Sequence, residues 1–315
     1  MQFEKQPQNP AKTAVSIGIL AILIVALLFV LVWTGVMKCG TIPGMCDAYY
    51  YIFGEPKVLI VYGDAGLGNP ELLHLTMADP TKLGIRAQTI HLSQVNTGNL
   101  REFQLVIVEK SRKMSTNQIK MFIDYATGGG RLVWTGDAGA ETDAESGDEL
   151  AYANDLDPNA EHKAISPWAR KTGTSIIRLD VLLGLTYVAN FCEVRGCTGT
   201  ETFVGNLQTE PTASDRLIYG IAPNLKLYAS EGKDFAIVKE NGESGAKRVL
   251  SVAYGPESNL VAGGKNYGKV FPMIVSSGLG GKVVYYATPP ETFVEDGKPQ
   301  KYYSFITNLY YDMFR

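Results

Sequence analysis

The stretch Lys57–Glu71, KVLIVYGDAGLGNPE, decides the fold class of this chain. The run Lys57–Tyr62 is apolar and β-branched almost throughout, which is typical of a strand buried on both faces of a parallel sheet. A glycine-rich turn follows, and then Asn69, Pro70 and Glu71 provide an N-cap, a first helical proline and an acid at the positive end of a helix. The stretch therefore predicts a strand, a turn and a helix.

The same alternation continues along the chain. Arg86–Leu92, Gln104–Lys110 and Arg131–Thr135 are predicted strands. A helix capped by Ser115 or Thr116 precedes the last of them, and Gly128-Gly129-Gly130 ends that helix. This order predicts βαβ units and a flavodoxin-like, doubly wound α/β sheet.

The C-terminal third is richer in strands. Turn signals at Asn241-Gly242 and Gly278–Gly281 separate them, and an amphipathic helix closes the chain. We expect these strands to extend the sheet and the last helix to cover one of its faces. The predicted strands are Leu225–Ala229, Phe235–Lys239, Arg248–Tyr254, Lys269–Ser276 and Lys282–Thr288.

Residues 13–37 contain no charged side chain. A helix of that length reaches about 38 Å, enough to cross a hydrocarbon core of about 30 Å. A buried core helix would show a polar face, and a cleavable signal peptide would have a shorter apolar region and a small-x-small site. The sequence therefore predicts one uncleaved transmembrane helix, a signal anchor.

Positive charge predicts the orientation of this anchor. Lys5, Lys12 and the amino terminus precede the span, whereas only Lys38 follows closely. The positive-inside bias therefore predicts a single-pass protein of the cell membrane with a cytoplasmic tail, residues 1–12. A juxtamembrane linker, 38–56, and a domain of residues 57–315 are expected outside the cytoplasm.

Four cysteines form two local pairs, Cys39 with Cys46 and Cys192 with Cys197. An even number in close pairs on the extracytoplasmic side favours two disulfides. Free thiols are an alternative. A zinc site is another, although it usually shows tighter Cys-x2-Cys spacing and more ligands.

Composition excludes some classes of protein. Hydrophobic residues make up 45% and charged residues 19%, which excludes disorder for most of the chain. A net charge of −3 lacks the basic footprint of a nucleic-acid-binding protein. The acidic stretch 141–175 is expected to be a long loop, either functional or partly disordered, and a solvated or partner-binding surface. Its Asp155–Asn159 starts like an EF-hand, but Ala160 and Ser166 replace the required glycine and glutamate.

Three segments resemble the class I glutamine amidotransferase-like superfamily, nearest its trehalose-utilisation (ThuA-like) branch. They are the strand and turn Lys57–Gly63, the helix–glycine–strand run from Phe122 to Val133, and the late strand Gly280–Thr288. Asp215–Ile221 is a weaker match. The resemblance spans most of residues 57–315 and implies the flavodoxin-like fold, with carbohydrate-linked roles in some members.

The chain departs from that family at the reactive corner. Amidotransferases place a nucleophilic cysteine on a sharp Gly-x-Cys-x-Gly turn, and the corresponding Thr135–Gly139 reads TGDAG. The histidines are His74, His91 and His162, so none lies late in the chain to serve a nucleophile. Since acyl transfer needs a nucleophile with a base in hydrogen-bond reach, amidotransferase activity is not expected.

The candidate ligand-binding residues are Asp64, Glu109, Asp137 and His91. They lie at the carboxyl ends of predicted strands, where open parallel sheets bind ligands. Gathered carboxylates there would suit Mg²⁺ or Ca²⁺, and the alternative is that Asp64 and Asp137 are turn residues bonded to their own backbone. No cofactor is predicted, because the glycines after the first strand match neither the dinucleotide fingerprint nor a Walker motif.

The sequence favours a membrane-anchored, non-catalytic binding or scaffold module of the cell envelope. Its expected partners are the lipid bilayer through residues 13–37 and an envelope protein or a glycan, with no nucleic acid. The competing hypothesis is a metal- or carboxylate-dependent hydrolase of an envelope carbohydrate or amide that uses Asp64, Glu109, Asp137 and His91. Fold alone does not choose between these classes.

Overall fold

The structure is a computed structural model that describes residues 10–33, 42, 44–54, 56–79, 83–143, 147–198, 201–209, 216–221, 225–256, 258–277, 282–293 and 303–314. The chain divides into two compact units. One comprises Met1–Glu55 with Phe314–Arg315, and the other comprises Pro56–Met313.

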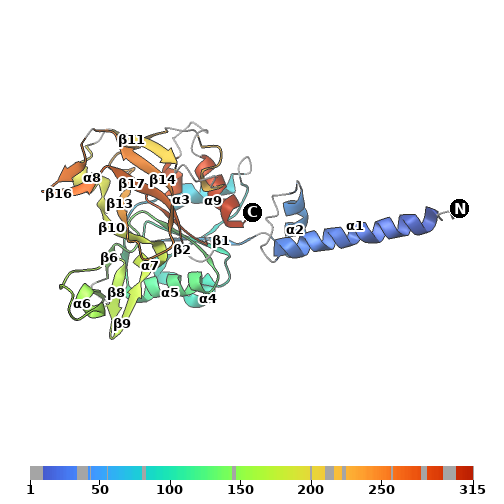
Figure 1. Cartoon of the computed structure of the whole chain (residues 1–315), viewed down its shortest axis with the longest axis horizontal. Coiled ribbons are helices and arrows are strands. Elements are labelled where there is room, and N and C mark those ends of the chain that lie inside the picture. Colours follow the sequence, from blue (N-terminus) through green and yellow to red (C-terminus); the bar gives the residue numbers. More distant parts are fainter. Residues whose placement is uncertain are drawn as a thin grey trace, which may run out of the picture. The chain divides into compact units, whose positions relative to one another are not determined.

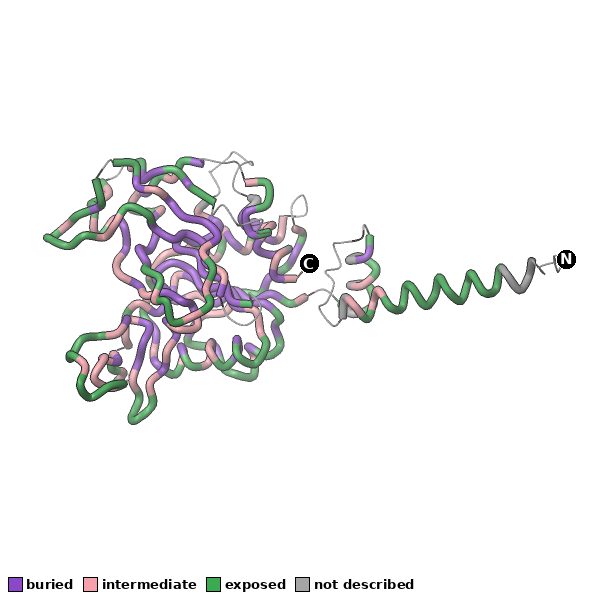
Figure 2. The backbone as a smooth tube through the Cα atoms, in the orientation of Figure 1, coloured by how far each residue is buried: buried purple, intermediate pink, exposed green. Residues whose placement is uncertain are grey.

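The first unit contains the helices α1, Pro10–Trp33, and α2, Met45–Phe53. The segment Ala14–Leu31 of α1 has a mean hydropathy of 3.1 and none of it is buried, as the exposed colour along α1 in Figure 2 shows. The predicted helix is therefore confirmed as one long and apolar enough to cross a membrane, a property that a signal sequence shares. Residues 34–37 of the predicted span, Cys39 and the Cys46 side chain lie outside what the structure describes.

In the second unit, the described residues form a nine-stranded sheet in the order β12-β11-β14-β17-β18-β5-β3-β1-β2. The half from β18 to β2 is parallel, and the half from β12 to β18 is antiparallel. The strands are β1 Val58–Tyr62, β2 Gln88–His91, β3 Leu105–Glu109, β5 Arg131–Thr135, β11 Thr202–Thr209, β12 Lys226–Ala229, β14 Lys247–Tyr254, β17 Val270–Ser277 and β18 Val283–Tyr286.

The parallel half has the burial that its sequence predicts. β3 and β18 are buried at every position, because helices cover both faces of the sheet. In Figure 1, α3, Pro70–Ala78, and α9, Tyr303–Phe314, lie on one side of the strands. The helices α4, Thr97–Leu100, and α5, Thr116–Thr127, lie on the other side.

Helix starts follow the expected caps. The Asn69 side chain accepts a hydrogen bond from the Leu72 N–H at the start of α3, with Pro70 at the first helical position. Ser115, rather than Thr116, caps α5, and its hydroxyl accepts from the Gln118 N–H. Since the Gln118 side chain accepts from the Ser115 N–H, the two residues form a capping box.

The acidic stretch 141–175 differs from the expected loop. It contains β6 Glu141–Thr142, β7 Glu149–Leu150, the helix α6 Ala153–Leu156 and β8 Ala169–Thr172, and the next strand is β9 Ser175–Arg178. β7, β8 and β9 form a small antiparallel sheet. The acidic composition predicted a loop here. The segment nevertheless forms strands, because the burial of a few residues such as Trp168 and Arg170 stabilises it.

The turn at Asn241-Gly242 does not join a hairpin of neighbouring sheet strands. The strand before it, β13 Ala236–Glu240, pairs with β10 Leu185–Asn190 outside the main sheet. By contrast, β17 and β18 pair antiparallel as the Gly278–Gly281 signal predicted, although the turn residues themselves lie outside the described part.

Candidate functional site

The turn after β5 is held from several directions by buried side chains. The Tyr285 hydroxyl donates to the Gly136 carbonyl at 2.8 Å, and the indole N–H groups of Trp134 and Trp168 both donate to the Ala138 carbonyl. Arg170 donates to the Gly139 carbonyl at 2.8 Å. Because β5, β18 and β8 all contribute donors, this turn presents the residue at its centre in one orientation.

That central residue is Asp137, whose side chain is 1% exposed. Its Oδ1 accepts from the Leu67 N–H at 2.8 Å, and its Oδ2 accepts from the Asn190 side-chain amide at 3.0 Å. Arg112 Nη1 lies 3.5 Å from the same Oδ2. Asp137 is therefore fixed at the centre of the turn, and its carboxylate is already bonded within the chain.

The glycine-rich turn after β1 lies against the turn after β5, and the two turns together form the site. Gly66 has a φ of +116°, and a Cβ there would lie 2.8 Å from Asp137 Oδ1 and 2.9 Å from the Arg112 backbone nitrogen. The turn's N–H groups are occupied by carboxylates of the same chain, since Leu67 donates to Asp137 and Asn69 donates to Glu291. The turn thus presents backbone N–H groups of the kind that bind anions, and carboxylates of the same chain already occupy them.

Arg112 is the centre of a charge network. It follows β3, where its N–H donates to the Ala65 carbonyl. Its guanidinium pairs with Asp137, with Glu141 at 2.7 Å and with Glu193 of the helix α8, Phe191–Arg195. Because three carboxylates surround one guanidinium group, the net charge of this network is negative.

A cavity of about 850 Å³ opens above these residues. Carboxylates of Asp137, Glu193 and Asp234, the Asn190 amide and the Cys192–Cys197 disulfide line it, and all come from the second unit. The cavity sits at the carboxyl ends of β1, β3 and β5, which is where open parallel sheets bind ligands.

Asp234 also lines this cavity, and its pKa is raised above the ordinary value. Burial raises its pKa to about 7, the charges of Glu193 and Asp137 add to the rise, and the N–H groups of Phe235 and Cys192 oppose it. Both carboxylate oxygens accept from the Cys192 N–H, at 3.0 and 3.1 Å. Near neutral pH this group holds a proton in part of the molecules.

Asp64 and His91 meet in a separate, smaller cavity of about 250 Å³. His91 Nε2 lies 3.2 Å from Asp64 Oδ1, and His91 Nδ1 lies 2.7 Å from the Ser93 hydroxyl. The order Ser, His, Asp is that of a proton relay. However, the Asp64 side chain is 95% exposed, and the Ser93 N–H also donates to His91 Nδ1, as in a local cap.

Glu109 lies in neither cavity. It is fully buried against Glu291 of the 3-10 helix η6, Pro290–Phe293. Burial, followed by the Glu291 charge, raises the pKa of Glu109, and burial raises the pKa of Glu291. The protonated form of these carboxyls is therefore favoured, because two facing charges would be costly to bury.

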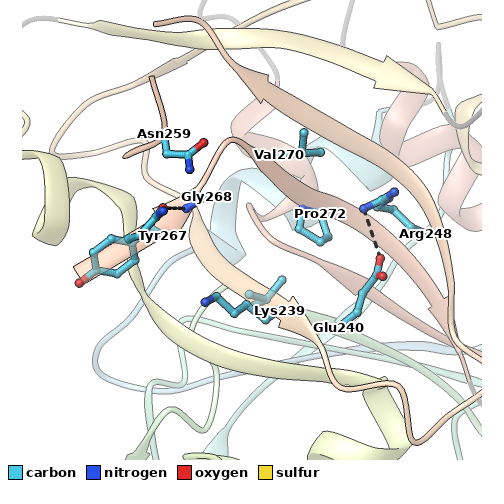
Figure 3. Close-up of a pocket in the computed structure, with 10 residues that line it drawn as sticks. Lys239, Glu240, Arg248, Asn259, Tyr267, Gly268, Val270 and Pro272 are labelled. Carbon is cyan, nitrogen blue, oxygen red and sulfur yellow. Dashed lines mark hydrogen bonds and ion pairs between the residues drawn. The ribbon is translucent and has the colours of Figure 1, made fainter. Parts of the chain in front are cut away.

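A third cavity, of about 440 Å³, lies away from all the predicted residues (Figure 3). The ion pair between Arg248 and Glu240, with 3.5 Å between nitrogen and oxygen, borders it. Val270 and Pro272 give it an apolar side.

The structure thus separates the four predicted ligand-binding residues into three places. Within the described residues, no cluster of three or more His, Cys, Asp or Glu side chains is arranged to hold a metal ion. The predicted Cys192–Cys197 disulfide is confirmed.

Sequence reasoning missed five residues that build the main cavity or its neighbours: Arg112, Asn190, Glu193, Asp234 and Ser93. Ser93 and Arg112 come one and two residues after the predicted strands Arg86–Leu92 and Gln104–Lys110, a position that would have flagged them. Asn190 lies in β10, Glu193 lies in α8, and Asp234 lies two residues before β13, and no local pattern links those segments to β5.

Comparison with known proteins gives no sequence match, because no family model and no curated protein matches the chain. Among solved structures, a β-galactosidase from Rahnella sp. R3 aligns with 85% of this chain and 33% of its own, at 17% identity and a TM-score of 0.48. A ThuA-like protein from Bacteroides uniformis aligns with 81% of this chain and 89% of its own, at 13% identity and a TM-score of 0.46.

A domain named mmIFT52 N-terminal domain aligns with 82% of this chain and 97% of its own, at 10% identity and a TM-score of 0.46. The chain spans about a third of the length of the β-galactosidase. At these scores, none of the three similarities carries a functional argument.

Proposed function

We propose that this protein is a membrane-anchored, non-catalytic binding module of the cell envelope, and that the 850 Å³ cavity above Asp137 holds a glycan. The observation that carries the proposal is the cavity wall. Carboxylate and amide groups line it, and protein hydrogen bonds already fix Asp137, Asn190 and Asp234 in place. These bonds hold the wall in place, and the exposed carboxylate of Glu193 on the same wall is an acceptor suited to sugar hydroxyl groups.

The described residues that line this cavity include no serine and no free cysteine thiol. Asp137 stands at the centre of the turn where the resembling family has its cysteine. Among the described residues lining the cavity, the two cysteines are joined in a disulfide. Binding without acyl transfer follows, because covalent catalysis requires an activated nucleophile.

Two further parts of the proposal concern family and compartment. We propose that the order β2-β1-β3-β5-β18 in the parallel half is a flavodoxin-like winding, which would fit a distant ThuA-like relationship. The Cys192–Cys197 disulfide supports an extracytoplasmic domain, since structural disulfides persist in oxidising compartments. On this proposal α1 is an uncleaved anchor and the N-terminus is cytoplasmic.

A binding experiment tests the proposal. The full chain in lipid nanodiscs is titrated with a panel of envelope oligosaccharides, and binding is followed by calorimetry. We expect at least one to bind the wild type and to bind Asn190→Ala at least about tenfold more weakly, because the substitution leaves Asp137 Oδ2 without its amide partner. The matched control, Glu240→Gln, lies at the other cavity and should bind like the wild type.

Hydrolysis of an envelope carbohydrate or amide is the second candidate function, and the raised pKa of Asp234 favours it. A carboxylic acid protonated near neutral pH can act as a general acid beside a second carboxylate, here Asp137. Turnover of a bound oligosaccharide by the wild type, abolished in Asp234→Asn, would establish this function over simple binding.

A further inference from the structure

In the first unit, the helix α2 packs against the carboxyl-terminal part of α1 (Figure 1). Leu28 and Phe29 of α1 contact the buried side chain of Met45 in α2. Ile42, just before α2, packs on the same side chain. The rings of Phe29 and Tyr49 also face each other, with 6.1 Å between their centroids. Side-chain contacts therefore fix α2 beside α1.

These contacts place α2 at a defined level along α1. Phe29 lies four residues before Trp33, the last residue of α1, which is about 6 Å of helix rise. The described side chains of α1 from residue 14 to residue 27 are exposed, whereas Leu28 and Phe29 are half-buried because α2 covers them. Helices that lie in a membrane interface bury their apolar face to about 5–10 Å, so α2 is at the level expected of one.

The sequence of α2 suits the boundary between lipid and water. The helix has nine residues, which is too short to span a membrane. Its one charged residue, Asp47, opposes full immersion in hydrocarbon. The run Tyr49–Tyr51 is typical of the interface, where the tyrosine ring contacts lipid and the hydroxyl group contacts water.

Part of the α2 surface has no cover within the described residues of the first unit. Tyr51 is 93% exposed and Ile52 is 61% exposed. Apolar side chains gain free energy when they leave water, so a cover is favoured here. Since α2 packs directly on α1, lipid that surrounds the exposed side chains of α1 (Figure 2) also reaches α2.

We propose that α2 is an interfacial helix that inserts Tyr51 and Ile52 into the leaflet reached by the carboxyl-terminal end of α1. The inference rests on the membrane anchor of the proposed function and adds a second lipid contact to it. Part of the juxtamembrane linker predicted at 38–56 is then held at the membrane surface and is not a free tether.

Tryptophan quenching in lipid nanodiscs tests the proposal on the full chain. Trp33→Phe provides the background, in which the remaining Trp134 and Trp168 are buried. Tyr51→Trp is added to it, and its fluorescence is measured with phosphatidylcholine brominated either near the headgroup or near the end of the acyl chain. Iodide in the buffer is the quencher from the aqueous side.

The shallow brominated lipid should quench the added fluorescence of Tyr51→Trp by about half or more, and more strongly than the deep one, because an interfacial side chain lies near the headgroups. Iodide should quench it at least about threefold less than it quenches N-acetyltryptophanamide, a fully solvated reference.

The matched control is Ile22→Trp in the same background, because Ile22 is 70% exposed near the middle of the apolar segment Ala14–Leu31. The deep brominated lipid should quench it most strongly. Absence of that quenching would contradict the anchor itself. Quenching of Ile22→Trp but not of Tyr51→Trp overturns the interfacial helix alone. That holds both when iodide reaches Tyr51→Trp, as for a helix in water, and when iodide is excluded, as for a helix covered by protein.

Discussion

At the scale of single residues, the site is built by carboxylates that the chain itself satisfies. Asp137 and Glu291 fill the N–H groups of the turn after β1, and Asp234 accepts the N–H groups of Cys192 and Phe235. Buried carboxylates without such donors would carry a large desolvation cost. Their positions therefore depend on the backbone conformation of the turns that hold them.

Gly66 is the most sensitive of these turn positions. Gly66→Ala should lower the free energy of unfolding by about 1–3 kcal/mol, because φ is +116° and the new Cβ meets Asp137 and the Arg112 backbone. Gly245→Ala is the control, since it has open space and an ordinary φ, and its effect should stay within about 0.5 kcal/mol. Chemical denaturation measures both, and equal effects would contradict the close approach at Gly66.

The Glu109–Glu291 pair predicts a pH dependence of stability. The folded-state pKa values lie above the ordinary 4.5, so the folded protein binds protons that the unfolded chain has released. The stability contribution is thus complete below about pH 4.5 and is lost as pH rises through the raised folded-state values.

Glu109→Gln tests this dependence, because an amide keeps a donor toward Glu291 at every pH. Its stability difference between pH 5 and pH 8 should be smaller than that of the wild type by at least about 1 kcal/mol. Glu240→Gln, on an exposed end of β13, should leave the difference unchanged. An unchanged slope in Glu109→Gln would show that the pKa of Glu109 is not raised in the folded protein.

Chemical labelling of Ser93 is a second test of the proposal that the protein is non-catalytic. Its hydroxyl contacts His91, but the Asp64 carboxylate beyond His91 is solvated. We therefore expect no labelling of Ser93 by a fluorophosphonate at concentrations that label a serine hydrolase fully. Stoichiometric labelling that disappears in His91→Ala would mean that the relay activates the serine.

At the scale of elements, the segment β7–β9 supports the turn after β5. Trp168 and Arg170 reach from this segment to the carbonyls of Ala138 and Gly139. The sequence predicted this region as a loop because its acidic surface residues outnumber its few buried ones. The segment is therefore a structural support for the turn after β5.

Trp168→Phe measures that support. It removes one of the two indole donors to the Ala138 carbonyl and leaves space in a fully buried site, so it should cost about 1–3 kcal/mol of stability. Hydrogen exchange at residues 136–139 should accelerate more than exchange in β11 or β12. Leu156→Ala, on exposed α6, is the control and should change neither quantity. Equal exchange at the turn in both variants would contradict the support.

The sequence predicted the elements better than the site. Strand and helix signals depend on local spacing, so β1, β3, β5, α3 and α5 could be predicted from apolar runs and caps. The cavity instead joins Asp137, Asn190 and Asp234, which are far apart in the chain and meet only through the pairing of β10 with β13. No local pattern in the sequence predicts that pairing. The burial of Glu109 was missed for the same reason, since its partner Glu291 lies near the C-terminus.

At the scale of the whole molecule, the chain contains an apolar helix and an α/β unit that carries a disulfide. We predict that the unit faces away from the cytoplasm. A membrane-impermeant maleimide should label Ser258→Cys in intact cells and Gln2→Cys only after lysis. The opposite labelling pattern would mean that the α/β unit faces the cytoplasm. The disulfide would then no longer support an extracytoplasmic location.

The most direct test of the binding proposal is native mass spectrometry of the full chain extracted from its own membranes in mild detergent. We expect a non-covalent adduct with the mass of an intact oligosaccharide, which is released on collisional activation and is absent from Asn190→Ala. An adduct that stays attached after denaturation, or conversion of added oligosaccharide to smaller products, would contradict a module that binds without reacting.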